Sequence, residues 1–124
     1  MMATLQNAAA IATALVALEH AYILVLEMFL WTHPRTRKIF GISAELAAMT
    51  RALAANQGLY NGFLAAGLAY GLVTGQREFL LFFLGCVVVA GVFGGLTAKP
   101  RIALVQAGPA ALAAVLVWAG WPAA

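Results

Sequence analysis

The stretch at residues 8–31, AAAIATALVALEHAYILVLEMFLW, decides the fold of this chain. It contains no proline or glycine. A helix rises about 1.5 Å per residue, so the stretch is long enough to cross a bilayer core of roughly 30 Å. The whole chain of 124 residues is similar in character, with 65% hydrophobic and 9% charged residues and a mean hydropathy of +0.95. Soluble domains carry about 25% charged residues. This composition excludes a soluble globular domain and predicts an all-α integral membrane protein.

Three further segments have the length and apolar character of membrane-spanning helices, at residues 53–73, 79–96 and 102–118. The connecting segments at residues 32–42, 74–78 and 97–101 hold prolines, glycines or charges, where helices tend to stop. Residues 43–52 are expected to continue helically into the second span along the membrane surface. The sequence therefore predicts a single domain over residues 1–124, a four-helix transmembrane bundle.

Basic residues mark two of the three connecting segments. Arg35, Arg37 and Lys38 lie in the first, and Lys99 and Arg101 lie in the third. The positive-inside rule places both segments in the cytoplasm and both termini outside, as in a multi-pass membrane protein. Seven basic against four acidic residues is a small excess, and aromatics do not alternate with the basic residues, so nucleic acid is not an expected partner. The first segment is interpreted mainly as a topology determinant, with binding of anionic lipid headgroups as the alternative.

Three ionisable residues lie inside the first span: Glu19, His20 and Glu27. At about 100° per residue they share one face of the helix, with the two glutamates roughly 12 Å apart along its axis. An ionised residue at mid-membrane costs about 2.5 to 3.5 kcal/mol, so such residues usually face protein or water and serve a function. We interpret these three as candidate proton-handling residues. No metal site and no cofactor are predicted, although haem ligation by His20 stays open.

A polar stripe in the second span supplies partners for these residues. It consists of Asn56, Gln57, Tyr60 and Asn61, and Gln106 lies early in the fourth span. Because the first two spans are antiparallel, Asn56 and Gln57 are expected at the depth of Glu27, and Asn61 nearer to His20. The five polar residues are therefore predicted to line a ligand site with Glu27. The alternative is that they act only as hydrogen bonds between helices.

Small residues and one proline bear on the packing of the helices. The pairs Gly58 with Gly62 and Gly91 with Gly95 have the small-xxx-small spacing that lets helix backbones approach. The faces that carry Gly58 and Gly91 are also candidate surfaces for a homo-oligomer. Pro109 removes a hydrogen bond inside the fourth span and is expected to shape that helix beyond Gln106.

Several of these residues form motifs that resemble a known family, the small bacterial membrane proteins catalogued as domain of unknown function 1304. The motifs are Glu19-His20-x-Tyr22-Ile23-x-x-Leu26-Glu27-Met28-Phe29-x-Trp31, Pro34-Arg35-x-x-Lys38-x-Phe40-Gly41 and Asn56-Gln57-Gly58-Leu59-Tyr60-Asn61-Gly62-Phe63. The resemblance implies a four-helix integral membrane protein over almost the whole chain, located in a bacterial inner membrane. It implies no activity.

Three functions fit this pattern. The first is binding or transport of a small lipophilic molecule coupled to a proton, in which four helices require a homo-oligomer for a complete pathway. The second is a membrane-embedded acid-base enzyme, an isomerase or lyase, in which Glu19, His20 and Glu27 move protons and the amides orient a lipophilic substrate. The third is a structural or accessory subunit whose polar residues only fix packing.

Overall fold

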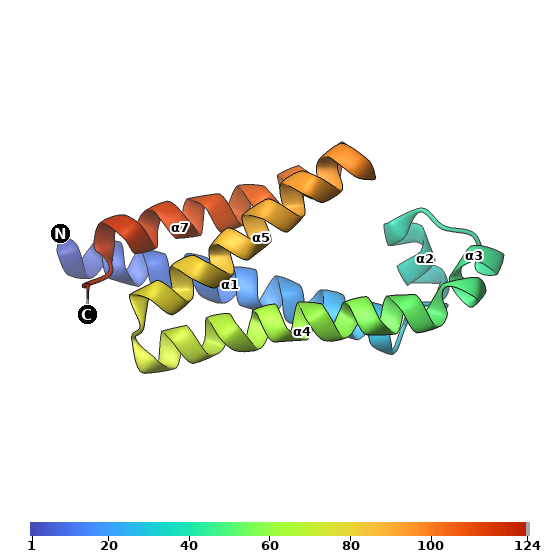
Figure 1. The fold of residues 1–124 in the computed structure, drawn as a ribbon, viewed down its shortest axis with the longest axis horizontal. Coiled ribbons are helices and arrows are strands. Elements are labelled where there is room, and N and C mark those ends of the chain that lie inside the picture. The colour runs from blue at the N-terminus through green and yellow to red at the C-terminus, as the bar shows by residue number, and fades with distance from the viewer. Residues whose placement is uncertain (124) are drawn as a thin grey trace. The chain divides into compact units, whose positions relative to one another are not determined.

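The computed structural model describes residues 1–123, and each regular element among them is a helix. In chain order the elements are α1 (Met2–Met28), α2 (Pro34–Phe40), α3 (Ala44–Met49), α4 (Arg51–Thr74), α5 (Arg77–Thr97), α6 (Pro100–Ile102), the π-helix η1 (Ala103–Ala107) and α7 (Gly108–Gly120) (Figure 1). The prediction of an all-α chain is confirmed.

Three of these helical segments are long and apolar enough to cross a membrane. They are α1, α5 and the continuous run Pro100–Gly120 made by α6, η1 and α7. The fourth long helix, α4, has 24 residues but is not among these three, because Asn56, Gln57 and Asn61 lower the hydropathy of its first half. The predicted count of four spans is therefore supported for three. The observed α1 begins and ends before the predicted span at residues 8–31.

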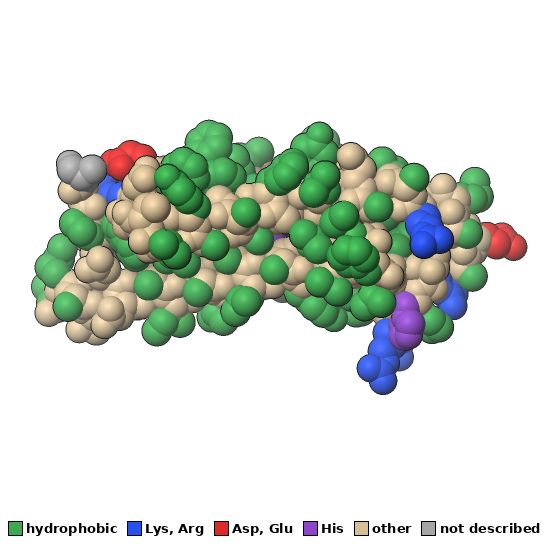
Figure 2. Space-filling view, turned by 90° about the horizontal axis from the view of Figure 1, so that it is seen from below, with side chains coloured by type: hydrophobic (Ala, Val, Ile, Leu, Met, Phe, Trp, Pro, Cys, Tyr) green, Lys and Arg blue, Asp and Glu red, His purple; other side chains and the backbone are tan. Residues whose placement is uncertain are grey.

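Large hydrophobic side chains remain exposed on these apolar helices. Phe82 and Phe93 of α5 and Leu104 of η1 are 66%, 67% and 75% exposed. Hydrophobic side chains also cover much of the face drawn in Figure 2, where charged side chains are few. Soluble monomers rarely expose apolar surface on this scale, whereas a lipid bilayer covers it at no cost.

The chain divides into two compact units. Unit 1 comprises Met1–Leu18 and the chain from Leu64 onward, and unit 2 comprises Glu19–Phe63. Each of the helices α1 and α4 contributes one segment to unit 1 and one to unit 2. A single domain over residues 1–124 stays a prediction.

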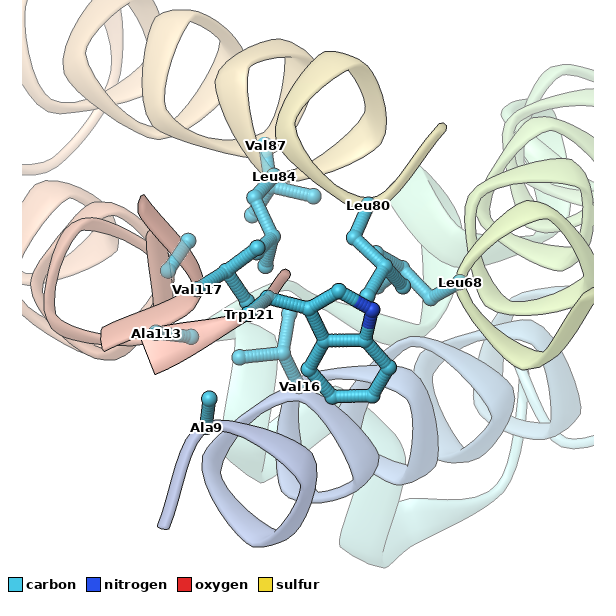
Figure 3. Close-up of a cluster of buried hydrophobic side chains, with 10 residues drawn as sticks. Ala9, Val16, Leu68, Leu80, Leu84, Val87, Ala113, Val117 and Trp121 are labelled. Atoms are coloured by element: carbon cyan, nitrogen blue, oxygen red, sulfur yellow. The ribbon is translucent and has the colours of Figure 1, made fainter. Parts of the chain in front are cut away.

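The core of unit 1 is built from four helices and the residue that follows α7. Its buried side chains include Ala9, Val16, Leu68, Leu80, Leu84, Val87, Ala113, Val117 and Trp121 (Figure 3). Trp121 is 8% exposed, and its indole Nε1 donates a hydrogen bond of 3.0 Å to the carbonyl of Gly75, which has a positive φ of 70° in the turn before α5. This bond ties the end of α7 to the turn between α4 and α5.

Within unit 1, α5 lies against η1 and α7, and two glycines make this approach possible (Figure 1). A Cβ at Gly91 would stand 2.7 Å from the backbone nitrogen of Ala107, and one at Gly95 would stand 2.5 Å from Cβ of Ala103. The predicted close packing at Gly91 and Gly95 is thus confirmed. Because it occurs within the chain, the expectation that the Gly91 face serves a homo-oligomer is wrong.

The last apolar segment carries a π turn just before its proline. The N–H of Gly108 donates to the carbonyl of Ala103, five residues earlier, and Pro109 follows with no N–H to continue the ladder. Pro109 was expected to alter the helix beyond Gln106. The observed irregularity includes Gln106 itself, since η1 runs over Ala103–Ala107.

In unit 2, the segment expected to be a connecting loop at residues 32–42 contains the helix α2. Pro34 occupies its first turn, where a missing N–H costs nothing, and the side chain of His33 caps it by accepting a hydrogen bond of 3.2 Å from the N–H of Arg35. Gly41 ends the helix with a positive φ of 67°. The prediction was wrong because Pro34 begins a helix here rather than ending one.

The surface helix expected at residues 43–52 is present but interrupted. Ser43 caps α3 through a hydrogen bond of 3.1 Å from the N–H of Leu46 to its Oγ. The helix ends at Met49, and Thr50, with φ −102° and ψ 8°, separates it from α4. The segment therefore does not run on continuously into the second long helix.

Candidate functional site

Two glycines of α4 let its first half lie close to the last turns of α1 in unit 2. A Cβ at Gly58 would stand 2.7 Å from Cγ of Met28 and 3.2 Å from the carbonyl oxygen of Leu24. A Cβ at Gly62 would stand 2.5 Å from Cδ1 of Leu24. The predicted packing role of Gly58 and Gly62 is confirmed. As with Gly91, the Gly58 face is occupied within the chain, so the expectation that it serves a homo-oligomer is wrong.

This close approach brings Glu27 within reach of α4. The Nδ2 of Asn61 donates a hydrogen bond of 2.8 Å to Oε2 of Glu27 and a second of 3.1 Å to the backbone carbonyl of Gln57. Asn61 was expected nearer to the level of His20. It instead reaches Glu27 because side chains on a helix lean toward its N-terminus, and for α4 that direction leads toward the end of α1.

Beside this pair lies a groove of about 240 Å³. Its lining is mostly apolar, and it holds one carboxyl group and one side-chain amide. The lining residues are Glu27, Trp31, Ile42, Leu46, Thr50, Leu53, Ala54 and Gln57. The groove therefore combines an apolar wall with few polar groups, as small-molecule sites commonly do.

One wall of the groove is held by a chain of contacts from Trp31. Its indole Nε1 donates a hydrogen bond of 3.0 Å to Oγ1 of Thr50, which in turn donates one of 2.7 Å to the carbonyl of Leu46. The Trp31 ring also packs edge-on against Phe40, with 4.9 Å between ring centroids. These contacts join the end of α1, α2 and α3 into one wall.

The structure brings together some of the predicted site residues and not others. Glu27, Gln57 and Asn61 meet at the groove. Asn56 and Tyr60 are exposed and do not line it, and the Tyr60 ring packs edge-on against Phe63. Gln106 is half-buried in η1, which belongs to unit 1.

Glu19 and His20 lie farther back along α1. Oε1 of Glu19 is buried and accepts no hydrogen bond from the described residues, whereas His20 is almost fully buried at 1% exposure. Since α1 is a continuous helix, Glu19 lies about 12 Å from Glu27 along the axis. Among the described residues, no three His, Cys, Asp or Glu side chains gather as metal ligands would.

Sequence reasoning did not assign Trp31, Thr50, Ile42 and Leu46 to the site. A signal for Trp31 was present, because it lies four residues after Glu27 and hence on the same helical face. Ile42, Leu46 and Thr50 gave no such signal, since their approach depends on the turn between α2 and α3 and on the break at Thr50.

A second hollow, of about 680 Å³, lies along α5 in unit 1. Its lining is Leu81, Phe82, Gly85, Cys86, Val89, Ala90 and Phe93. Apart from the Cys86 thiol, this lining has no polar side chain. It resembles lipid-facing surface more than a site that orients a ligand, so we assign the candidate site to the groove of unit 2.

Comparison with known proteins identifies the family. A family model described as "Protein of unknown function (DUF1304)" matches residues 14–118. The chain belongs to this DUF1304 family. It is 34% identical over 105 residues to "Uncharacterized protein YpaA" of Lactococcus lactis subsp. lactis (strain IL1403), a match that covers 82% of this chain and 88% of that relative. No solved structure matches the chain.

Membership of the DUF1304 family confirms the resemblance seen in the sequence motifs. The matched region contains all of the groove lining, as well as Glu19, His20 and Gln106. The family description carries no activity, so function has to be argued from the groove.

Proposed function

We propose that this protein binds a small lipophilic molecule in the groove of unit 2 and that binding is coupled to a proton on Glu27. The observation that supports the proposal is the place of the Glu27 carboxyl group. It lines a mostly apolar groove, and Asn61 holds one of its oxygens at 2.8 Å. An ionisable group in an apolar setting costs free energy, so such a group usually serves a function. The Glu27 carboxyl group can orient a ligand and exchange a proton.

The size of the groove limits the ligand. Pockets for drug-sized molecules span roughly 300–1,000 Å³, and this groove measures about 240 Å³. We therefore expect a compact molecule, with an apolar body against Leu46 and Leu53 and a polar group at Glu27 and Gln57. Such a molecule concentrates in lipid, so a groove beside apolar helices receives it from the bilayer.

The proposal includes a membrane arrangement with four spans. The helix α4 has 24 residues and extends about 36 Å, more than a bilayer core of roughly 30 Å. If α4 crosses, the basic residues around α2 and at Lys99 and Arg101 lie in the cytoplasm of a bacterium and both termini lie outside the inner membrane. Transport by so few helices requires more than one copy, so the transporting form is a homo-oligomer.

Purification in a mild detergent tests the proposal directly. Native mass spectrometry reports bound small molecules and the number of copies, and an absorption spectrum reports any haem on His20. Because Trp31 lines the groove, we expect saturable changes in tryptophan emission when small lipophilic probes are added, and loss of these changes in Trp31→Phe. If neither charged nor uncharged probes bind saturably to a folded sample, the proposed function is wrong.

An acid-base enzyme, an isomerase or lyase with a lipophilic substrate, is a second candidate. The observation that favours it is the buried Oε1 of Glu19, which accepts no hydrogen bond from the described residues. Glu19 could therefore act as a second proton donor or acceptor beside Glu27. An enzyme predicts turnover in sealed vesicles without net movement, lost in Glu19→Gln and Glu27→Gln. If both variants keep full function and only melt at lower temperature, the polar residues serve packing alone.

A further inference from the structure

The lining of the groove holds one carboxyl group and no basic side chain. Glu27 is its acidic residue, and no lysine, arginine or histidine is among the lining residues. The arginines and the lysine of unit 2 lie outside the lining: Arg35, Lys38 and Arg51 are exposed, and Arg37 is half-buried. A carboxylate in an apolar lining is costly without a counter-charge. The groove therefore favours a ligand that brings a positive charge.

Two contacts fix the Trp31 ring, which lines the groove. Its N–H is already donated to Thr50, and its orientation is fixed by Phe40 at an interplanar angle of 61°. Indole is the strongest aromatic partner for a cation within about 6 Å of the ring. Glu27 and Trp31 are both lining residues. An ammonium group in the groove therefore meets a carboxyl group and an indole ring in the same lining.

Hydrogen-bond donors in and beside the groove are mostly engaged. Thr50 donates to Leu46, and Asn61 donates to Glu27 and to the backbone of Gln57. The side-chain amide of Gln57 is the donor that remains in the lining. By contrast, Oε1 of Glu27 accepts no hydrogen bond from the described residues. The site therefore offers little to an anion and more to a cation.

We infer that the ligand of this groove is a small lipophilic cation, a substituted ammonium held between the Glu27 carboxylate and the Trp31 ring. The inference rests on the proposed function and names its ligand class. The apolar substituents of the ammonium pack against Leu46, Leu53 and Ala54, which line the same groove.

The same geometry makes a proton and the cation alternative occupants of Glu27. Glu27 is the titratable side chain of the lining; the α4 side chains that face it are the amides Gln57 and Asn61, and the wall that includes Thr50 is apolar or hydroxylic. On α1 itself, the buried His20 and Glu19 lie about 10 and 12 Å away along the axis. On α2, Arg37 is half-buried and lies outside the lining. A quaternary ammonium has no proton to give, so its binding to protonated Glu27 releases one proton from the carboxyl group.

Three probes of similar size test the charge of the ligand: benzyltrimethylammonium, its uncharged carbon isostere neopentylbenzene, and the anion phenylacetate. Each is titrated into the full-length protein in a nonionic detergent, with tryptophan emission and calorimetry as readouts. We expect the cation to bind roughly 3- to 30-fold more tightly than the neutral isostere, and the anion to bind weakest. Cation affinity should fall as pH is lowered, because protons compete for Glu27.

Two variants that lose the same charge distinguish an effect of the Glu27 site from an effect of the protein's net charge. Glu27→Gln should remove the pH dependence and reduce the preference for the cation to the part that Trp31 supplies, whereas Glu45→Gln, at an exposed position of α3, should leave both unchanged. Trp31→Leu should lower the affinity for the cation several-fold more than the affinity for the neutral isostere. Melting curves establish that each variant is folded.

The outcomes distinguish the inference from the proposed function. If the neutral isostere or the anion binds the folded wild type as tightly as the cation, the charge preference is wrong although the groove binds ligands. If Glu27→Gln keeps the full cation preference and its pH dependence, Glu27 contributes to neither and the inference fails. If none of the three probes binds, the proposed function itself fails.

Discussion

Asn61 donates hydrogen bonds both to the Glu27 side chain and to the backbone of its own helix, at 2.8 and 3.1 Å. Replacing it with alanine leaves the Glu27 carboxyl group without this donor. We expect Asn61→Ala to lower the free energy of unfolding in detergent by about 1 kcal/mol and to weaken cation binding. The exposed amide of Asn56 on the same helix provides the control, and Asn56→Ala should change stability by less than about 0.5 kcal/mol. If both variants lost the same stability, Asn61 would have no special role at Glu27.

Thr50 gives a second test at the residue scale, because its hydroxyl both accepts from Trp31 and donates to Leu46. Valine has nearly the same shape but cannot accept, so Thr50→Val leaves the half-buried indole N–H without a partner. We expect a loss of about 1 to 2 kcal/mol in stability and a shift in the emission of Trp31. In the matched variant Thr74→Val, the lost hydroxyl is one that donates to the Tyr70 carbonyl within α4. That variant should leave the emission unchanged.

At the residue scale, the sequence showed which side chains need a polar partner, but it did not show which partner each of them contacts. Glu27 and the amides of α4 were predictable because a carboxyl group in an apolar span has to meet a polar group from another helix. The pairing of Glu27 with Asn61 was not, because a difference of one helical turn in depth decides it. That turn is set by the contact of Gly58 with Met28 and Leu24, which depends on the fold.

At the scale of the elements, two glycines of α5 make a matched pair. A Cβ at Gly91 meets the backbone of Ala107 at 2.7 Å, whereas a Cβ at Gly85 meets nothing within 4 Å. We expect Gly91→Ala to destabilise the protein by about 1 to 3 kcal/mol, because backbone cannot move aside as a side chain does. Gly85→Ala should be neutral or stabilise by up to about 1 kcal/mol, because alanine favours the helix. Thermal unfolding in detergent compares the two, and similar melting temperatures would contradict the packing of α5 on η1.

At the element scale, apolar runs predicted the long helices correctly, whereas proline and glycine positions led to a wrong prediction for α2. The long helices were predictable from apolar runs, but α2 was not, because Pro34 is favourable in a first helical turn and unfavourable farther in. The cap from His33 and the left-handed Gly41 then make a short helix from a segment with the composition of a loop. The break at Thr50 has a local cause as well, since its hydroxyl is bonded back to Leu46 and forward to Trp31.

On the scale of the whole molecule, composition alone indicated the apolar, all-helical character of the chain. It could not determine whether α4 crosses the membrane, because polar residues in the first half of α4 lower its hydropathy, and two of them contact Glu27 or line the groove. Gln57 and Asn61 serve contacts with α1 and the groove rather than with lipid. A hydropathy scale that assumes every face meets lipid therefore underestimates the tendency of such a helix to span the membrane.

Thiol labelling tests the crossing of α4. In a Cys86→Ala background, single cysteines replace exposed residues of the connections, Thr32 before α2, Gln76 between α4 and α5, and Ala98 between α5 and α6. A membrane-impermeant maleimide added to bacterial spheroplasts should label Gln76→Cys directly and label Thr32→Cys and Ala98→Cys only after lysis. Since a helix that crosses puts its two ends on opposite sides, labelling of Thr32→Cys and Gln76→Cys from the same side would mean that α4 does not span. The groove would then lie at the membrane surface, and a ligand would reach it from water rather than from lipid.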